Sequence, residues 1–243
     1  MKRPAIALAA AVLSSSAAFA AQVTNVIDNM TTFQSLSAEN NSVTNTAASG
    51  GAIGGFRTIT LSSTGNDPGL PTSLSISAAN QRMTLNTPEG PTPAFELRWA
   101  GAGGTNGLGG IDFGAGQPID LFTSILSFSL RSTDQANDFT WTFTDTFNQT
   151  ASYTGTFPVH SSGDPILPYN VALISFTNAS AVSWNSIGSI TFSGGGVTGL
   201  DMSVPAPFQV VTSTVPEPGT WALLVTGVVL ATLALHRKAK QRA

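Results

Sequence analysis

The acidic side chains of this 243-residue chain are its clearest candidates for chemistry. Glycoside hydrolysis uses two carboxylates that face each other across a cleft. The middle of the chain supplies Glu89, Glu96, Asp112, Asp120, Asp134, Asp138 and Asp145. Their spacing does not pair them. Glu96 stands opposite the apolar face of its segment and Asp134 lies in a polar turn, so we expect solvated carboxylates and keep a hydrolase only as an alternative.

A serine nucleophile would need a general base. His160 is the one histidine before the C-terminal tail, and it lies in a turn-rich loop with Asp164. No G-x-S-x-G sequence is present, so we expect a solvated loop histidine rather than a catalytic triad. With no cysteine in the chain, the usual zinc ligand sets are also excluded, which leaves oxygen ligands for a hard cation such as calcium.

Exposed aromatic rings can stack on sugar rings beside amide and carboxylate partners. Trp184 and Asn185 lie in a polar stretch, and we predict a glycan contact there. Tyr153 and Tyr169 lie in similarly polar surroundings. Two other tryptophans alternate with polar residues and share a strand face with apolar neighbours, which predicts core positions. These two are Trp99 and Trp141.

An alternation of apolar and polar residues predicts the elements that position these groups. It is clearest in 139–147, where aromatic residues alternate with threonines, and it recurs in 57–61, 74–77, 95–99, 126–130, 190–193 and 200–204. Sheets with one apolar face bury it against a second sheet. We therefore predict an all-β fold, a single antiparallel β-sandwich of jelly-roll type over residues 21–204, followed by a Pro/Ser/Thr stalk at 205–214.

Charge limits the partners of this central region. Between Ala21 and Val215 there are four arginines, twelve acidic residues and no lysine, a net charge of −8. Such a surface cannot neutralise a phosphate backbone, so nucleic acid is an unsuitable partner, while neutral sugars or cations fit better. The absence of cysteine excludes disulfides, so stability must come from packing.

The N-terminus has the pattern of a secretory signal peptide. A basic start is followed by an apolar stretch, and a small-x-small site ends the segment at Ala18 and Ala20. We predict a signal peptide at 1–20, handling by the secretion translocon, and a mature chain that begins at Ala21.

The C-terminus, 215–243, combines three features in a set order. Val215, Pro216, Glu217 and Pro218 form an extended, proline-constrained stretch. An apolar segment follows, and we predict a transmembrane helix at about 219–236, flanked by Trp221 on one side and by Arg237 and Lys238 of a basic tail, 237–243, on the other.

This arrangement resembles the PEP-CTERM sorting signal of Gram-negative bacteria that make exopolysaccharide. Gly219 stands where such signals more often carry serine. The resemblance covers only this terminus. It implies processing by an exosortase, a membrane transpeptidase, so that the chain is held in the inner membrane first and then reaches the cell surface or biofilm matrix.

The central region resembles, at the level of pattern, other PEP-CTERM proteins and the sandwich modules that bind carbohydrate, through a strand around Val26-Ile27-Asp28 followed by 54–58. Such modules often carry a structural calcium where first and last strands meet, so the resemblance implies a calcium site at Asp28 and Asp201. We therefore expect an exported, non-catalytic matrix or surface protein associated with exopolysaccharide. A hydrolase acting on that polysaccharide and a purely structural surface protein are the alternatives.

Overall fold

The computed structural model describes residues 22–102 and 107–214. The predicted signal peptide and the predicted sorting signal with its helix lie outside these residues, so both stay predictions. Residues 22–213 form one compact unit. Within the described residues, no helix has the length and apolar character needed to cross a membrane.

Fifteen strands account for most of the described residues. In chain order they are β1 (Gln22–Asp28), β2 (Gln34–Ala38), β3 (Ser42–Ala48), β4 (Phe56–Thr64), β5 (Thr72–Ser77), β6 (Arg82–Asn86), β7 (Thr92–Trp99), β8 (Ile119–Leu130), β9 (Ser132–Thr133), β10 (Asn137–Asp145), β11 (Thr150–Phe157), β12 (Leu167–Ala172), β13 (Ile187–Gly195), β14 (Met202–Pro205) and β15 (Phe208–Thr214). Two 3₁₀ turns, η1 (Ile53–Gly55) and η2 (Leu173–Ser175), complete the described elements.

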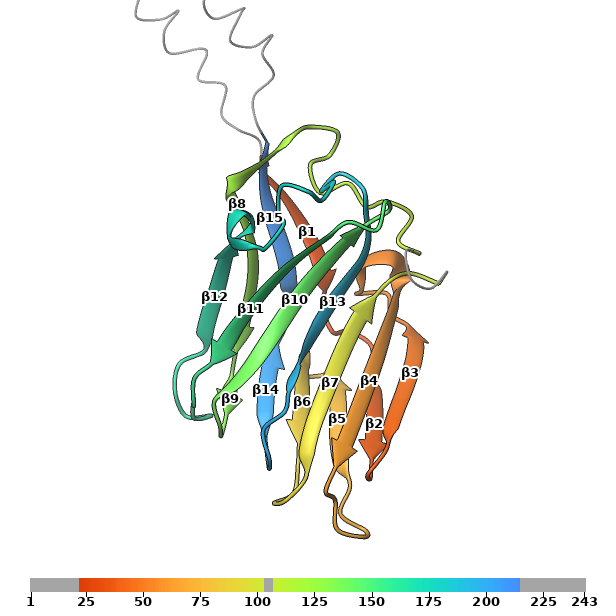
Figure 1. The fold of residues 1–243 in the computed structure, drawn as a ribbon, viewed down its shortest axis with the longest axis vertical. Coiled ribbons are helices and arrows are strands. Elements are labelled where there is room, and N and C mark those ends of the chain that lie inside the picture. Colours follow the sequence, from red (N-terminus) through yellow and green to blue (C-terminus); the bar gives the residue numbers. More distant parts are fainter. Residues whose placement is uncertain (1–21, 103–106, 215–243) are drawn as a thin grey trace, which may run out of the picture. The chain divides into compact units, whose positions relative to one another are not determined.

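The strands form three antiparallel sheets (Figure 1). One has six strands in the order β11-β10-β13-β7-β4-β3, one has five in the order β2-β5-β6-β14-β9, and one has four in the order β1-β15-β8-β12. The buried apolar side chains of all three sheets belong to one core cluster. This confirms the predicted all-β, antiparallel class, and a sandwich fits the arrangement.

At two places the chain crosses from one of the two smaller sheets to the other. Arg131 alone separates β8 of the four-stranded sheet from β9 of the five-stranded sheet, and Ala206 and Pro207 separate β14 from β15. In Figure 1 these two sheets lie one below the other behind the six-stranded sheet. The second layer of the sandwich is therefore split into two sheets, with strands that change sheet at its corner.

The predicted stalk at 205–214 is largely a strand, which corrects the sequence-based boundary. Residues of β15 pair with β1, from Gln22 opposite Ser213 to Asp28 opposite Phe208. Phe208 and Val210 are fully buried, which is the period-two pattern of a strand with one core face. Pro205 and Pro207 suggested a stalk, but Pro205 ends β14, where it pairs with Arg82, and Pro207 lies in the turn before β15.

Aromatic rings fill the centre of the core. Trp99 and Trp141 are fully buried, as predicted, and stack with ring centroids 5.9 Å apart. Phe139 contacts a group of rings from four other strands, including Phe128 at 5.4 Å and Phe157 at 4.3 Å. Because each ring buries a large apolar area, this cluster carries much of the stability of a chain without disulfides.

Candidate binding cleft on the five-stranded sheet

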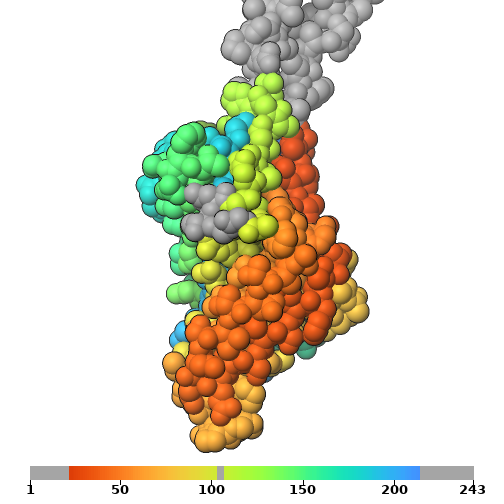
Figure 2. Space-filling view, turned by 90° about the vertical axis from the view of Figure 1, so that its right-hand side faces the viewer, coloured from red at the N-terminus to blue at the C-terminus, as the bar shows by residue number. Residues whose placement is uncertain are grey.

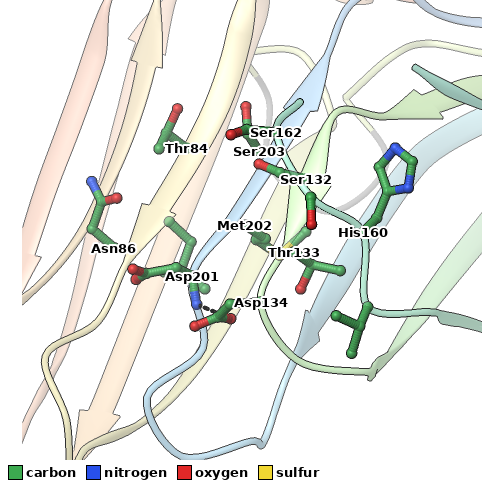
Figure 3. Close-up of a pocket in the computed structure, with 13 residues that line it drawn as sticks. Thr84, Asn86, Ser132, Thr133, Asp134, His160, Ser162, Asp201, Met202 and Ser203 are labelled. Carbon is green, nitrogen blue, oxygen red and sulfur yellow. Dashed lines mark hydrogen bonds between the residues drawn. The ribbon is translucent and has the colours of Figure 1, made fainter. Parts of the chain in front are cut away.

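A cleft of about 480 Å³ lies on the outer face of the five-stranded sheet, over β6, β14 and β9 (Figure 3). The segment 159–162, which follows β11, forms its remaining side. That segment is held at the edge of the sheet because Thr133 and His160 exchange two backbone hydrogen bonds of 2.8 Å each.

Cross-strand pairing brings three hydroxyl side chains together on the floor of this cleft. Ser203 of β14 lies between Thr84 of β6 and Ser132 of β9. Alternate residues of the same strands, Leu85 and Met202, point into the core and are buried. The alternation therefore directs the hydroxyl groups outward, into the cleft.

The hydroxyl of Ser203 is the most unusual group in the cleft. Its residue is only 7% exposed, and its Oγ makes no hydrogen bond to any described residue. Buried polar groups are usually paired, and an unpaired one costs about 1–3 kcal/mol. A hydrogen-bonding group supplied from the cleft, by water or by a ligand, would remove this cost.

Two carboxylates stand at one end of the same cleft. The backbone N–H of Asp201 donates to Oδ1 of Asp134 at 2.8 Å, and the N–H of Thr87 donates to Oδ1 of Asp201 at 2.6 Å (Figure 3). Both aspartates are exposed, and their Oδ2 atoms accept no hydrogen bond from the part of the chain that the structure describes. Since lysine and arginine are missing from the described lining, these carboxylates make the cleft acidic.

His160 is at the rim of the cleft but is not arranged as a general base. Its Nε2 lies 2.9 Å from the carbonyl oxygen of Pro165, to which it can only donate. Its Nδ1 is 4.0 Å from a carboxylate oxygen of Asp164. Among the described residues no serine hydroxyl bonds to this imidazole, so the geometry provides no support for a serine hydrolase.

The prediction that Trp184 presents an exposed ring is wrong. The side chain is 4% exposed, packs against Phe143 and Phe176, and donates its Nε1–H to the carbonyl of Ala179 at 2.9 Å. Its polar neighbours in sequence belong to a turn that folds over the core, which hides the ring. As an exposed sugar platform it is therefore excluded.

Asn185 has a structural role in the same turn. Its amide donates to Oδ1 of Asp112 and to the carbonyl of Gln117, at 2.8 and 2.9 Å. Asp112 in turn accepts the backbone N–H of Gly114. The amide is therefore already engaged in holding the 112–117 loop, and a glycan contact there stays a prediction without geometric support.

Asp28 and Asp201 are not brought together by strand pairing. The first and last strands are neighbours, as the calcium hypothesis required, but Asp201 precedes β14 of another sheet and lies beside Asp134. Within the described residues no group of three or more acidic or histidine side chains could hold a metal. Calcium binding stays a prediction, and this arrangement does not provide a shared site.

The carboxylate of Asp28 is instead part of a fully buried network. Its Oδ2 accepts from Nη1 of Arg57 at 2.7 Å and from Nε1 of Trp99 at 2.8 Å, and its Oδ1 accepts the N–H of Met30. The ion pair was not foreseen from the sequence. Arg57 stands in a strand that alternates Arg-Thr-Ile-Thr-Leu, in phase with the buried residues, and that phase was the available clue.

No known family model matches the chain, and no curated protein matches it in sequence. Some solved structures are similar to its backbone. The family 11 carbohydrate-binding module of a cellulosomal cellulase of Clostridium thermocellum has 11% identity and a TM-score of 0.37, over 82% of this chain and 99% of that one. A family 30 carbohydrate-binding module has 12% identity and a TM-score of 0.40, over 79% and 99%.

An agarase is also similar, with 9% identity and a TM-score of 0.41, over 65% of this chain and 23% of the agarase. Carbohydrate-binding modules and parts of carbohydrate-active enzymes are thus both among the similar structures. At such low identities and TM-scores, the chain is assigned to neither group, and its function must be argued from its own residues.

Proposed function

We propose that this chain is an exported surface or biofilm-matrix protein whose β-sandwich binds neutral extracellular polysaccharide without cleaving it. The carrying observation is the buried hydroxyl of Ser203, which has no hydrogen-bond partner among the described residues and belongs to the lining of a cleft with hydroxyl, amide and carboxylate groups. Export and surface release are proposed from the terminal sequences, through the translocon and an exosortase-type transpeptidase.

The chemistry of the cleft favours a neutral, hydroxyl-rich ligand. Sugar hydroxyls both donate and accept, so they complement Thr84, Ser132 and Ser203, which do the same. Asp134 and Asp201 accept from sugar hydroxyls in charge-assisted hydrogen bonds, which are stronger than neutral ones. The same carboxylates would repel an anionic ligand such as a nucleic acid.

The first test is a calorimetric titration of the full-length chain, in detergent, with neutral polysaccharide purified from the host's own secretions. We expect saturable heat and no new reducing ends. Accumulating reducing ends would replace this proposal with the hydrolase alternative. Neither heat nor reducing ends would favour a structural surface protein that has no glycan ligand.

Replacing Ser203 with alanine should separate binding from stability. Removing a buried hydroxyl that lacks a partner should leave the free energy of unfolding unchanged or slightly higher. Glycan affinity should fall roughly 2- to 10-fold, the value of one hydrogen bond. Ser49→Ala is the matched control, because Ser49 Oγ is also buried and without a hydrogen bond to any described residue, but it is not part of the cleft. If both variants bind the glycan with equal affinity, Ser203 does not contribute to glycan binding.

Deleting Val215 to Pro218 while keeping the apolar segment and basic tail should block processing. The expected product stays in the inner membrane at its unprocessed mass, because the proline-constrained stretch that a transpeptidase would recognise is gone. Fractionation and mass spectrometry of the released protein measure this. A matched deletion of four residues elsewhere in the chain, 103–106, should be released normally. Normal release of the motif deletion would contradict exosortase processing.

A further inference from the structure

Building on the proposed function, we infer that the cleft is one end of a longer groove that takes a linear neutral polysaccharide lying across the strands. The row of hydroxyl side chains on which this inference rests leaves the cleft at β6 and continues over β5 and β2 on the outer face of the same sheet. The ligand class is therefore an extended polymer rather than a single sugar.

One continuous row of hydroxyl groups runs across all five strands of this sheet. The register pairs Ser35 with Ser75, Ser75 with Thr84, Thr84 with Ser203, and Ser203 with Ser132. Neighbouring strands are about 4.8 Å apart, so the row is roughly 19 Å long. Only its last three members lie in the cleft, and the others extend it.

A second row lies beside the first. Asn86 of β6 is opposite Ser73 of β5, which is opposite Ser37 of β2. The serines of both rows on β2 are exposed, and those on β5 are half-buried. Because serine is the smallest hydroxyl side chain, a polymer can approach the sheet closely there while every sugar finds donors and acceptors.

The direction of these side chains is set by the core. Leu36, Leu74 and Ile76 alternate with the serines on β2 and β5 and are almost completely buried. A slip of one residue would place the serines in the core and the aliphatic residues in water. Burial of the alternate aliphatic residues therefore keeps both rows of hydroxyl side chains on the outer face of the sheet. β2 is one edge strand of this sheet and β9 is the other. Figure 2 shows the side of the domain where the early strands, red to orange, reach the surface.

Serine on an exposed strand face is not by itself evidence of a site. What distinguishes this row is that it includes Ser203, which is more than nine-tenths buried and has no hydrogen-bond partner in residues 22–102 and 107–214. Charge supports the same ligand class. The rows themselves carry no charged residue, and the acids at the cleft end, Asp134 and Asp201, oppose an anionic polymer.

The test compares ligand lengths on the full-length chain. The probes are oligosaccharides of increasing length, cut from the neutral polysaccharide used above, from one sugar to chains longer than the row. We expect affinity to rise with length until the row is filled. The double variant Ser35→Ala/Ser75→Ala should then lose about tenfold in affinity for the long chains and nothing for the shortest ligand that binds.

Ser152→Ala/Ser193→Ala is the matched control, since both residues are half-buried and lie on β11 and β13 of the six-stranded sheet. It should leave every affinity unchanged. If the short ligands bind but affinity does not rise with length, or if the double variant matches wild type, the extended groove is wrong and the cleft proposal stands. If no probe of any length binds, the proposed function itself fails.

Discussion

Replacing Arg57 with methionine is expected to lower the free energy of unfolding by about 3–5 kcal/mol. The side chain is fully buried, and its guanidinium donates to Asp28, to Oε1 of Gln34 and to the carbonyl of Thr32 at 2.6–2.7 Å. Methionine has a similar apolar stem, so the loss comes mainly from the polar groups. The variant leaves the Asp28 carboxylate buried without its counter-ion.

Urea unfolding of the full-length chain, followed by tryptophan fluorescence, measures this effect. Arg82→Met is the matched control because Arg82 stands on the outer face of β6, partly exposed, opposite Ser77 and Pro205. We expect its free energy of unfolding to stay within about 0.5 kcal/mol of wild type. A similar small loss for Arg57→Met would mean that the buried network contributes little, contrary to its geometry.

Phe139→Ala should destabilise the sandwich by about 3–5 kcal/mol. The ring is 1% exposed and contacts Phe157, Phe128 and Tyr169, with centroids 4.3, 5.4 and 5.7 Å away. These rings come from strands of both layers, so the cavity would lie between the sheets. The neighbours cannot close it without giving up their own contacts.

The control for this change is available at the end of the same strand. Phe147 follows β10, is 70% exposed, and stands in a turn whose backbone N–H groups are held by Asp145. Phe147→Ala should change the free energy of unfolding by less than about 0.5 kcal/mol. Denaturant midpoints of the two variants, measured side by side, test the assignment of Phe139 on β10 to the core and of Phe147 after β10 to the surface. Equal midpoints would contradict it.

The strands were largely predictable because side-chain direction alternates locally. The 139–147 pattern predicted β10 as far as Asp145, whereas Phe147, which the pattern placed on the apolar face, lies beyond the strand and is exposed. The segments 57–61, 74–77, 95–99 and 190–193 lie within β4, β5, β7 and β13. The burial of Trp99 and Trp141 followed from the same alternation. Prolines misled the reading of β15, since its pattern begins only after Pro207.

Trp184 marks the limit of this reasoning. Its sequence neighbours are polar, and only the fold of its turn over Phe143 and Phe176 buries the ring. The partner of Asp28 was equally hidden, because Arg57 lies on another strand of another sheet. Such contacts depend on how the strands are ordered in space, and a local pattern holds no information on that order.

By itself, then, the sequence determined the all-β class, the acidic and lysine-free character of the central region, and which positions on most strands face the core. Only the tertiary structure determined which residues form the cleft. Thr84, Ser132 and Ser203 become neighbours because β6, β9 and β14 pair, although they are far apart along the chain. Alternation specifies the face on which a side chain lies, but strand order and register specify its neighbours, and these depend on packing the whole core at once.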